Sequence, residues 1–129
     1  MKFLLDTHVA IRWEANHPSL SQATRNLILG ATDDVLVSRC SLWEIAVKVN
    51  LGRLKIDLGR FLQRIELTGF RWLGIESDHI LAYASLPVFS DHKDPFDRLL
   101  VAQSLTEPLI LVTADARLAR YGSTVRVVV

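Results

Sequence analysis

The chain has 129 residues, of which half are apolar or aromatic and 22% are charged. This balance is typical of one globular domain with one hydrophobic core and excludes a disordered chain. The formal net charge of +1 gives no strong indication for or against a nucleic-acid partner.

The sequence favours a cytoplasmic protein. No apolar run approaches the ~18 residues expected of a membrane helix. The first six residues are too short and too soon acidic for a secretion signal. The single cysteine, Cys40, excludes an internal disulfide and is expected to be a small buried hydrophobe rather than a reactive thiol.

Strand and helix signals alternate along the whole chain. In the first half of the chain they predict a strand at 2–5, a helix from Asp6-Thr7 to before Asn16, a helix from a Ser19 cap to Leu29, a strand at 35–37, and helices at 41–50 and 58–68. A strand at 70–75 and a helix from a Ser77-Asp78 cap to before Pro87 follow, and then a polar loop at 88–94. The last elements are a helix from Asp94-Pro95 to Leu105, a strand at 109–112, a short helix at 115–120 and a strand at 125–129. Such alternation is typical of an α/β domain with a mainly parallel sheet and helices on both faces. We expect one domain over residues 1–129.

Four acids lie where predicted strands pass into helices: Asp6, Glu44, Asp97 and Asp115. Ligands of open α/β sheets bind outside the carboxyl ends of the strands, so these side chains are expected to converge. Four carboxylates would repel one another there unless a cation joined them. Hard cations such as Mg²⁺ and Mn²⁺ take carboxylate and water oxygens and can activate water for attack on a phosphodiester.

Each acid also has a purely structural explanation. Asp6 can cap a helix, and Glu44 can pair with Lys48 four residues later. Asp97 and Asp115 can favour the first turns of their helices. The four histidines show no zinc spacing, although His8 and His92 could lie near the cleft. Asp94 precedes a proline and is interpreted as a helix cap, outside the metal site.

Two further groups of side chains have open interpretations. The three tryptophans lie in apolar patterns and are expected in the core, although Trp43 could instead stack on a base. The basic residues could form a rim that follows phosphates or could simply be scattered surface charge. They are Arg12, Arg25, Arg39, Lys48, Arg53, Lys55, Arg60, Arg64, Arg71, Arg98, Arg117, Arg120 and Arg126.

Four segments together resemble the PIN domain family, and more narrowly the VapC toxins of type II toxin–antitoxin pairs. The segments are Leu4-Leu5-Asp6-Thr7-His8, Ser41-Leu42-Trp43-Glu44-Ile45-Ala46-Val47-Lys48, His92-Lys93-Asp94-Pro95-Phe96-Asp97-Arg98-Leu99-Leu100-Val101-Ala102-Gln103 and Leu111-Val112-Thr113-Ala114-Asp115. They span nearly the whole chain in the family's order, and the third is the most specific.

The resemblance implies a PIN-like three-layer fold and a Mg²⁺- or Mn²⁺-dependent endoribonuclease that cuts single-stranded regions of RNA. Its acidic quartet corresponds to Asp6, Glu44, Asp97 and Asp115, and Thr113 corresponds to a supporting hydroxyl. It also implies a homodimer and a cognate VapB-type antitoxin. Arg98 and Arg117, next to two of these acids, are candidates for contacting phosphate or an antitoxin acid.

Two alternatives remain open from the sequence alone. A phosphatase of the haloacid dehalogenase type also places an aspartate after its first strand, but it needs a second aspartate where this chain has His8. A PIN-like module without catalytic activity could instead serve in binding. The intact acidic quartet argues against that alternative.

Overall fold

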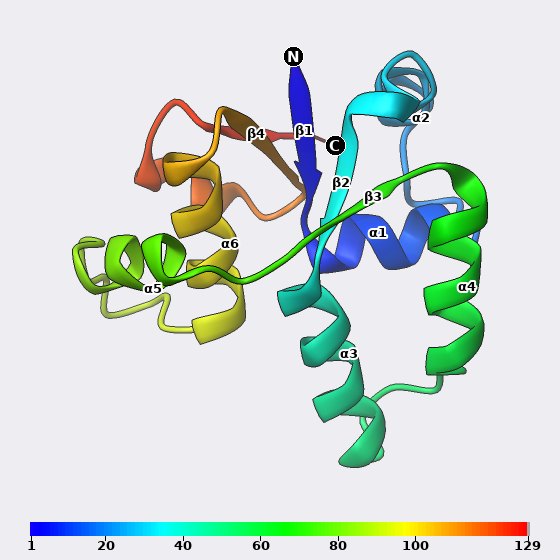
Figure 1. Ribbon diagram of the computed structural model, residues 1–129, viewed down its shortest axis with the longest axis horizontal. Coiled ribbons are helices and arrows are strands. Elements are labelled where there is room, and N and C mark those ends of the chain that lie inside the picture. Colours follow the sequence, from blue (N-terminus) through cyan, green and yellow to red (C-terminus); the bar gives the residue numbers. More distant parts are fainter. Residues whose placement is uncertain (129) are drawn as a thin grey trace.

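The computed structural model describes residues 1–128 and has three layers, with a sheet between two layers of helices (Figure 1). Its five strands are all parallel and stand in the order β3-β2-β1-β4-β5. They are β1 (Lys2–Leu5), β2 (Val35–Ser38), β3 (Arg71–Leu73), β4 (Leu109–Thr113) and β5 (Val125–Val127). The architecture confirms the predicted three-layer α/β fold.

The helices of the described residues connect these strands. They are α1 (Thr7–Glu14), α2 (Gln22–Leu29), the 3₁₀ helix η1 (Thr32–Asp34), α3 (Arg39–Asn50), α4 (Leu58–Thr68), α5 (Ser77–Ala84), α6 (Pro95–Thr106) and the 3₁₀ helix η2 (Ala116–Tyr121). Within residues 1–128, none of them is both long enough and apolar enough to cross a bilayer.

Apolar side chains of the strands alternate between the two faces of the sheet, as the pleat requires. Phe3 and Leu5 pack into one core with α1, α3 and α4, whereas Leu4 packs into a second core with α6. Figure 1 shows α5 and α6 on one side of the strands and α4 on the other. The sheet is therefore buried on both faces, which explains the continuous apolar runs of its central strands.

Strand β1 is the switch point of the sheet. It pairs with β2 on one side and with β4 on the other. The chain places β2 and β3 on the first side of β1 and then returns to place β4 and β5 on the second side. The backbone amide of Asp6 donates to the carbonyl of Val112, 2.9 Å away, at the carboxyl end of this pair. Such a switch point is where open α/β sheets bind ligands.

Several local predictions are confirmed at the level of hydrogen bonds. The Asp94 carboxylate accepts from the backbone amides of Phe96 and Asp97 and caps α6, with Pro95 at the first helical position. Helix α4 spans the predicted residues, with Phe61 and Ile65 buried. Cys40 is buried, and burial raises the pKa of its thiol to about 12, which excludes a reactive thiolate.

Three predicted helix starts were wrong by one or two residues. Ser21, not Ser19, caps α2, because Ser19 instead hydrogen-bonds the His17 ring at 2.6 Å in the preceding turn. Helix α3 begins at Arg39 because the hydroxyl of Ser38 already accepts from the amide of Cys40. Helix α5 has Glu76 at its N-cap, in place of the predicted Ser77-Asp78.

The ends of the sheet also differ from the prediction. Strand β3 is shorter than residues 70–75, because only Arg71–Leu73 align with β2. The predicted helix at 115–120 is a 3₁₀ helix. Strand β5 ends at Val127, and Val129 of the predicted last strand lies outside the described residues.

Trp43 does not belong to the core, contrary to the prediction. It is 57% exposed and packs edge-to-face against Phe96, with ring centroids 4.9 Å apart. The position is exposed because the buried face of α3 turns Ile45 and Glu44 inward, and Trp43 lies beside that face. Trp13 and Trp72 are half-buried against the core, as expected.

Candidate active site

Asp6 is the most firmly held of the four predicted acids. It caps α1, with Oδ1 accepting from the amide of His8 at 2.7 Å, and Oδ2 accepts from the Thr113 hydroxyl at the end of β4. Burial opposes ionisation of Asp6, but the hydrogen bonds from His8 and Thr113 outweigh it and lower the pKa of this carboxyl. Asp6 is therefore a fixed, ionised carboxylate.

Thr113 also connects Asp6 to Asp115. Its hydroxyl oxygen accepts from the amide of Asp115 at 3.0 Å, so one side chain holds both acids across the β1–β4 pair. A cavity of about 200 Å³ opens between the two acids, lined by Asp6, His8, Arg12, Ala114 and Asp115. The supporting hydroxyl that the sequence suggested thus bridges two of the candidate ligands.

Asp115 is paired with a cation at the rim of this cavity. Its Oδ2 lies 2.8 Å from Nη2 of Arg117 and its Oδ1 accepts from Nε of the same guanidinium at 3.1 Å. This hydrogen-bonded pair lowers the pKa of Asp115. Half of the Arg117 side chain is exposed, so the guanidinium can also reach a ligand.

Glu44 is buried, with 1% of its surface exposed. Its Oε2 is paired with Nζ of Lys48 at 2.7 Å, whereas Oε1 is buried and has no hydrogen-bond partner among the described residues. A buried carboxylate oxygen without a partner carries a large desolvation cost. The pair with Lys48, one of the explanations open from the sequence, is present, but it satisfies only half of the carboxylate.

Asp97 lies in the first turn of α6 and is the least compensated of the acids. Its Oδ2 has the ring Nε2 of His92 as hydrogen-bond partner at 3.3 Å. Burial, and then repulsion from Asp6 and Asp94, raise the pKa of this carboxyl to about 6. The influence of Asp6 and Glu44 on this pKa indicates that Asp97 shares one electrostatic environment with these two acids.

Within residues 1–128, one group of three potential metal ligands has its ligand atoms all within 4.8 Å of one another: His92, Asp97 and Asp115. From the sequence, His92 was expected only to lie near the cleft. Asp6 and Glu44 lie outside this compact group. The missed signal was the position of His92 in the loop directly before the Asp94-Pro95 helix start.

Two other predicted neighbours of the site have different environments. Arg98 does not belong to the basic rim, contrary to the prediction: it is 7% exposed, and its Nη1 donates to the carbonyl of Pro87 and the hydroxyl of Tyr121. His8 lies at the cavity with Nδ1 3.7 Å from Oδ1 of Asp6, and the hydrogen-bonding interaction with this carboxylate, together with its charge, raises the pKa of the ring.

Comparisons with known proteins agree with the fold and the resemblance. The sequence model described as the PIN domain matches residues 3–123. The chain belongs to the PIN domain family. Ribonuclease VapC22 of Mycobacterium tuberculosis is 33% identical over 117 residues, covering 89% of this chain and 88% of that protein. Membership of this family favours the nuclease interpretation over the phosphatase alternative.

Two solved structures have the same fold as this PIN domain. A chain of the DNA-bound VapBC of Salmonella typhimurium aligns with a TM-score of 0.69 at 19% identity, covering 99% of this chain and 97% of that one. A chain of VapBC2 of Rickettsia felis, bound to a promoter DNA fragment, aligns with a TM-score of 0.66 at 17% identity, covering 99% and 98%. At these identities the likeness concerns the fold.

Proposed function

We propose that this PIN domain is a Mg²⁺- or Mn²⁺-dependent endoribonuclease that cuts single-stranded regions of RNA as the toxin of a VapBC pair. The observation that carries the proposal is the gathering of carboxylates at the carboxyl ends of β1 and β4, beside Asp97, whose pKa is raised to about 6 by burial and then by repulsion from Asp6 and Asp94. Carboxylates crowded at a switch point repel one another and so destabilise the fold, but they favour the binding of a cation. The VapC22 relative, a ribonuclease by name, supports the same reaction.

The donor set fits a hard divalent cation. Asp6, Glu44, Asp97 and Asp115 supply carboxylate oxygens, and the unpartnered Oε1 of Glu44 is the kind of atom that a cation or its water would satisfy. A bound Mg²⁺ or Mn²⁺ would supply Lewis-acid activation for phosphodiester hydrolysis. Sites with cysteine or several histidines favour softer metals, and this site lacks that character within residues 1–128.

The chain's own side chains have separate tasks around that cation. Thr113 holds the carboxylate of Asp6 and the backbone of Asp115, so that it fixes the start of the segment that carries the second acid. Lys48 holds one oxygen of Glu44 and leaves the other buried without a hydrogen-bond partner. Arg117, exposed and bound to Asp115, is placed to exchange part of that contact for a substrate phosphate.

A basic groove beside the carboxylates suits the backbone of a single strand. It measures about 400 Å³, and its lining includes five cationic or histidine side chains but no carboxylate: His8, Arg12, His17, Lys48 and Arg53. His8 and Arg12 also line the cavity between Asp6 and Asp115, so groove and site are continuous. Phosphates bound in the groove would lead a strand directly to the acids.

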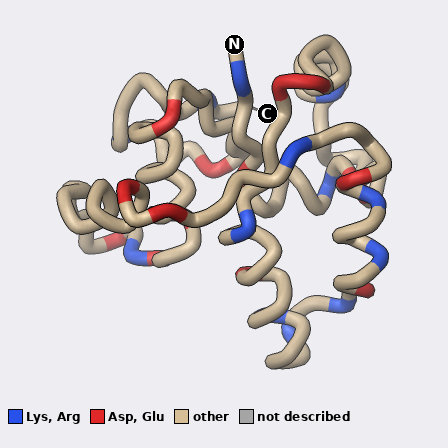
Figure 2. The backbone as a smooth tube through the Cα atoms, in the orientation of Figure 1, with Lys and Arg blue, Asp and Glu red and all other residues tan. Residues whose placement is uncertain are grey.

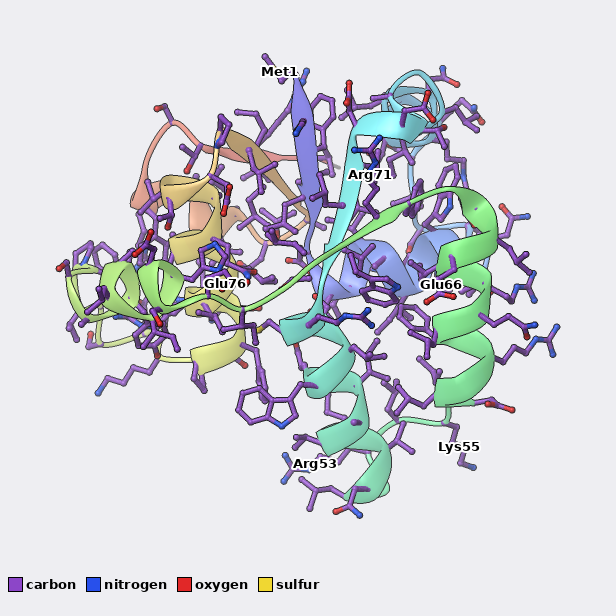
Figure 3. The ribbon with its side chains drawn as sticks, viewed as in Figure 1. Met1, Arg53, Lys55, Glu66, Arg71 and Glu76 are labelled. Atoms are coloured by element: carbon purple, nitrogen blue, oxygen red, sulfur yellow. The ribbon has the colours of Figure 1, made fainter. Side chains whose placement is uncertain are left out.

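The net charge of the segment from α3 to the start of β3 is also favourable for RNA binding. Residues 39–71 contain seven Lys or Arg and three Asp or Glu. Figure 2 shows the basic positions along α3, the following loop and α4. Figure 3 shows Arg53 and Lys55 projecting from that loop. We therefore assign the predicted basic rim to α3, the following loop and α4 rather than to the whole surface.

The proposed partners are a VapB-type antitoxin and a second copy of the chain, and residues 1–129 are proposed to act as a single domain. The VapBC complexes among the structural neighbours support the antitoxin. Exposed apolar side chains offer two separate candidates for a dimer surface, because α4 and α5 lie on opposite sides of the strands: Leu67 on α4, or Ile80, Leu81 and Val88 on α5 and the loop after it. A small open reading frame beside the gene should encode an antitoxin that blocks cleavage when the two proteins are copurified.

The decisive experiment compares RNA cleavage by the wild type, Asp97→Asn and Asp33→Asn. Asp33 is an exposed acid in η1, which precedes the amino end of β2, and therefore supplies a matched control at the other end of the sheet. Purified, antitoxin-free protein is incubated with a pool of structured RNAs in Mg²⁺, in Mn²⁺ and in EDTA. Cleavage should need the metal, be lost in Asp97→Asn and persist in Asp33→Asn. Absence of cleavage by folded wild-type protein in either metal would favour the binding-module alternative.

A further inference from the structure

A buried chain of hydrogen bonds connects Arg98 to Asp97 through two other side chains. Nη1 of Arg98 lies 3.0 Å from the hydroxyl of Tyr121, which lies 2.9 Å from Nδ1 of His92. Nε2 of His92 then lies 3.3 Å from Oδ2 of Asp97. Arg98, Tyr121 and His92 are all buried, so water does not compete for these contacts.

The direction of the chain follows from its first member. An arginine guanidinium can only donate, so the Tyr121 oxygen accepts from Arg98. The hydroxyl has one proton, and within residues 1–128 its other hydrogen-bond partner is Nδ1 of His92. This proton is satisfied only if Tyr121 donates to Nδ1, and Nδ1 is then unprotonated. The ring proton of neutral His92 is then on Nε2, where it donates to Asp97.

We propose that His92 is a positioning residue for Asp97 and not a metal ligand, although its ring lies within the compact group of potential ligands. This inference rests on the proposed function of the site. A ligating Nε2 would have to be unprotonated, which would move the ring proton to Nδ1. The hydroxyl proton of Tyr121 would then lose its acceptor in a buried environment, at the cost of an unsatisfied donor.

The surrounding contacts hold His92 in this role. Its backbone amide donates to the carbonyl of Phe89, and the Phe89 ring packs edge-to-face on Tyr121 with centroids 5.2 Å apart. Arg98 also donates to the carbonyl of Pro87, so it fixes both the loop that carries His92 and the tyrosine that orients it. This explains why the arginine next to Asp97 points into the protein instead of toward substrate. Second-sphere groups of this kind orient the ligands of metal sites.

The tautomer of His92 tests the inference without any nuclease assay. Long-range ¹H–¹⁵N spectra of the ¹⁵N-labelled, metal-free protein identify which ring nitrogen carries the proton. We expect a protonated Nε2 and an unprotonated Nδ1 for His92, and loss of this preference in Tyr121→Phe. A ring protonated at Nδ1 in the wild type would overturn the proposal, even if the protein cuts RNA.

Pulsed EPR of the protein loaded with Mn²⁺ tests the second half of the inference. We expect no directly coordinated ¹⁴N in the wild type, because Asp97 and not His92 would contact the ion. A strong ¹⁴N coupling that disappears in His92→Gln would overturn the proposal and make His92 a ligand. Neither spectrum depends on cleavage, so failure of the proposed function and failure of this inference remain distinguishable.

Activity measurements add a graded comparison. His92→Ala should lower kcat by roughly 10- to 100-fold, the usual range for second-sphere groups, with little change in KM. His92→Gln should recover part of the loss, because the amide can still donate to Asp97. Tyr83→Phe is the matched control for Tyr121→Phe, because Tyr83 contacts Arg98 without contacting His92, and it should retain wild-type activity. Equal losses in Ala and Gln variants that remain folded would contradict the positioning role.

Discussion

Replacing Asp97 with asparagine should abolish cleavage and at the same time stabilise the metal-free protein. The substitution removes a charge from a side chain that is only 14% exposed and retains nearly the same volume. Burial and the neighbouring acids Asp6 and Asp94 raise the pKa of this carboxyl, so its ionised form is strained at neutral pH. The amide oxygen can still accept from Nε2 of His92.

The magnitude follows from the pKa. A rise from 3.8 to about 6 corresponds to about 3 kcal/mol of destabilisation when Asp97 is ionised. The buried amide of asparagine carries a desolvation cost of its own, which offsets part of this gain. We therefore expect Asp97→Asn to raise the free energy of unfolding by about 1 to 3 kcal/mol at pH 7 in EDTA.

The pH dependence fixes the sign of the effect. Because the folded-state pKa of Asp97 lies above its unfolded value, the wild type loses stability relative to the variant as pH rises from about 4 to about 6. Below pH 4 the variant should lack this advantage, and above about pH 6.5 the difference should be constant. Urea unfolding of both proteins across this range, in EDTA and with Asp33→Asn as the matched control, measures it.

Divalent cations should reverse the order of stability. A ligand present at a hundredfold excess over its Kd stabilises the folded protein by about 2.7 kcal/mol, and this gain should be smaller in Asp97→Asn because a ligand is missing. If the variant is no more stable than the wild type in EDTA at pH 7, the reasoning from carboxylate repulsion is wrong. If it cuts RNA at the wild-type rate, the assignment of Asp97 is wrong.

Three other substitutions probe separate parts of the site. Glu44→Gln should lower Mn²⁺ affinity by at least about tenfold; calorimetric titration that detects no change would remove Glu44 from the ligand set. Thr113→Val removes the hydroxyl between Asp6 and Asp115 and should cost about 1 to 3 kcal/mol in urea unfolding; an unchanged midpoint would contradict its bridging role. In the Asp97→Asn background, Arg12→Ala should reduce the slope of log affinity for single-stranded RNA against log salt by about 0.7; an unchanged slope would place the strand outside the basic groove.

The positions of Asp6 and Asp115 could be predicted because they depend on local sequence patterns alone. Each follows a short apolar run that becomes a central parallel strand, and parallel strands end at one edge of the sheet. The start of α6 was equally predictable, because Asp94 followed by proline satisfies the free amides of a first turn without help from the rest of the fold.

The environments of Arg98 and His92 depend on contacts between distant segments, which no local pattern reveals. Arg98 turns inward because the hydroxyl of Tyr121, 23 residues away, accepts a hydrogen bond from its guanidinium. His92 reaches Asp97 because the loop after α5 folds back on η2. Sequence periodicity could not identify Trp43 as exposed either, because the buried side of α3 includes the charged Glu44.

The four acids differ in how their charges are compensated, and this difference leads to a second stability test. Asp6 has hydrogen bonds that lower its pKa, and that stabilisation is present above about pH 4 and lost as pH falls through the folded-state pKa. Asp6→Asn should therefore destabilise the metal-free protein at pH 7, opposite in sign to Asp97→Asn. Urea unfolding in EDTA measures both variants. Shifts of the same sign would show that compensation by Thr113 and His8 does not separate the two carboxylates. Opposite shifts would identify Asp97 as the acid whose charge most requires the cation.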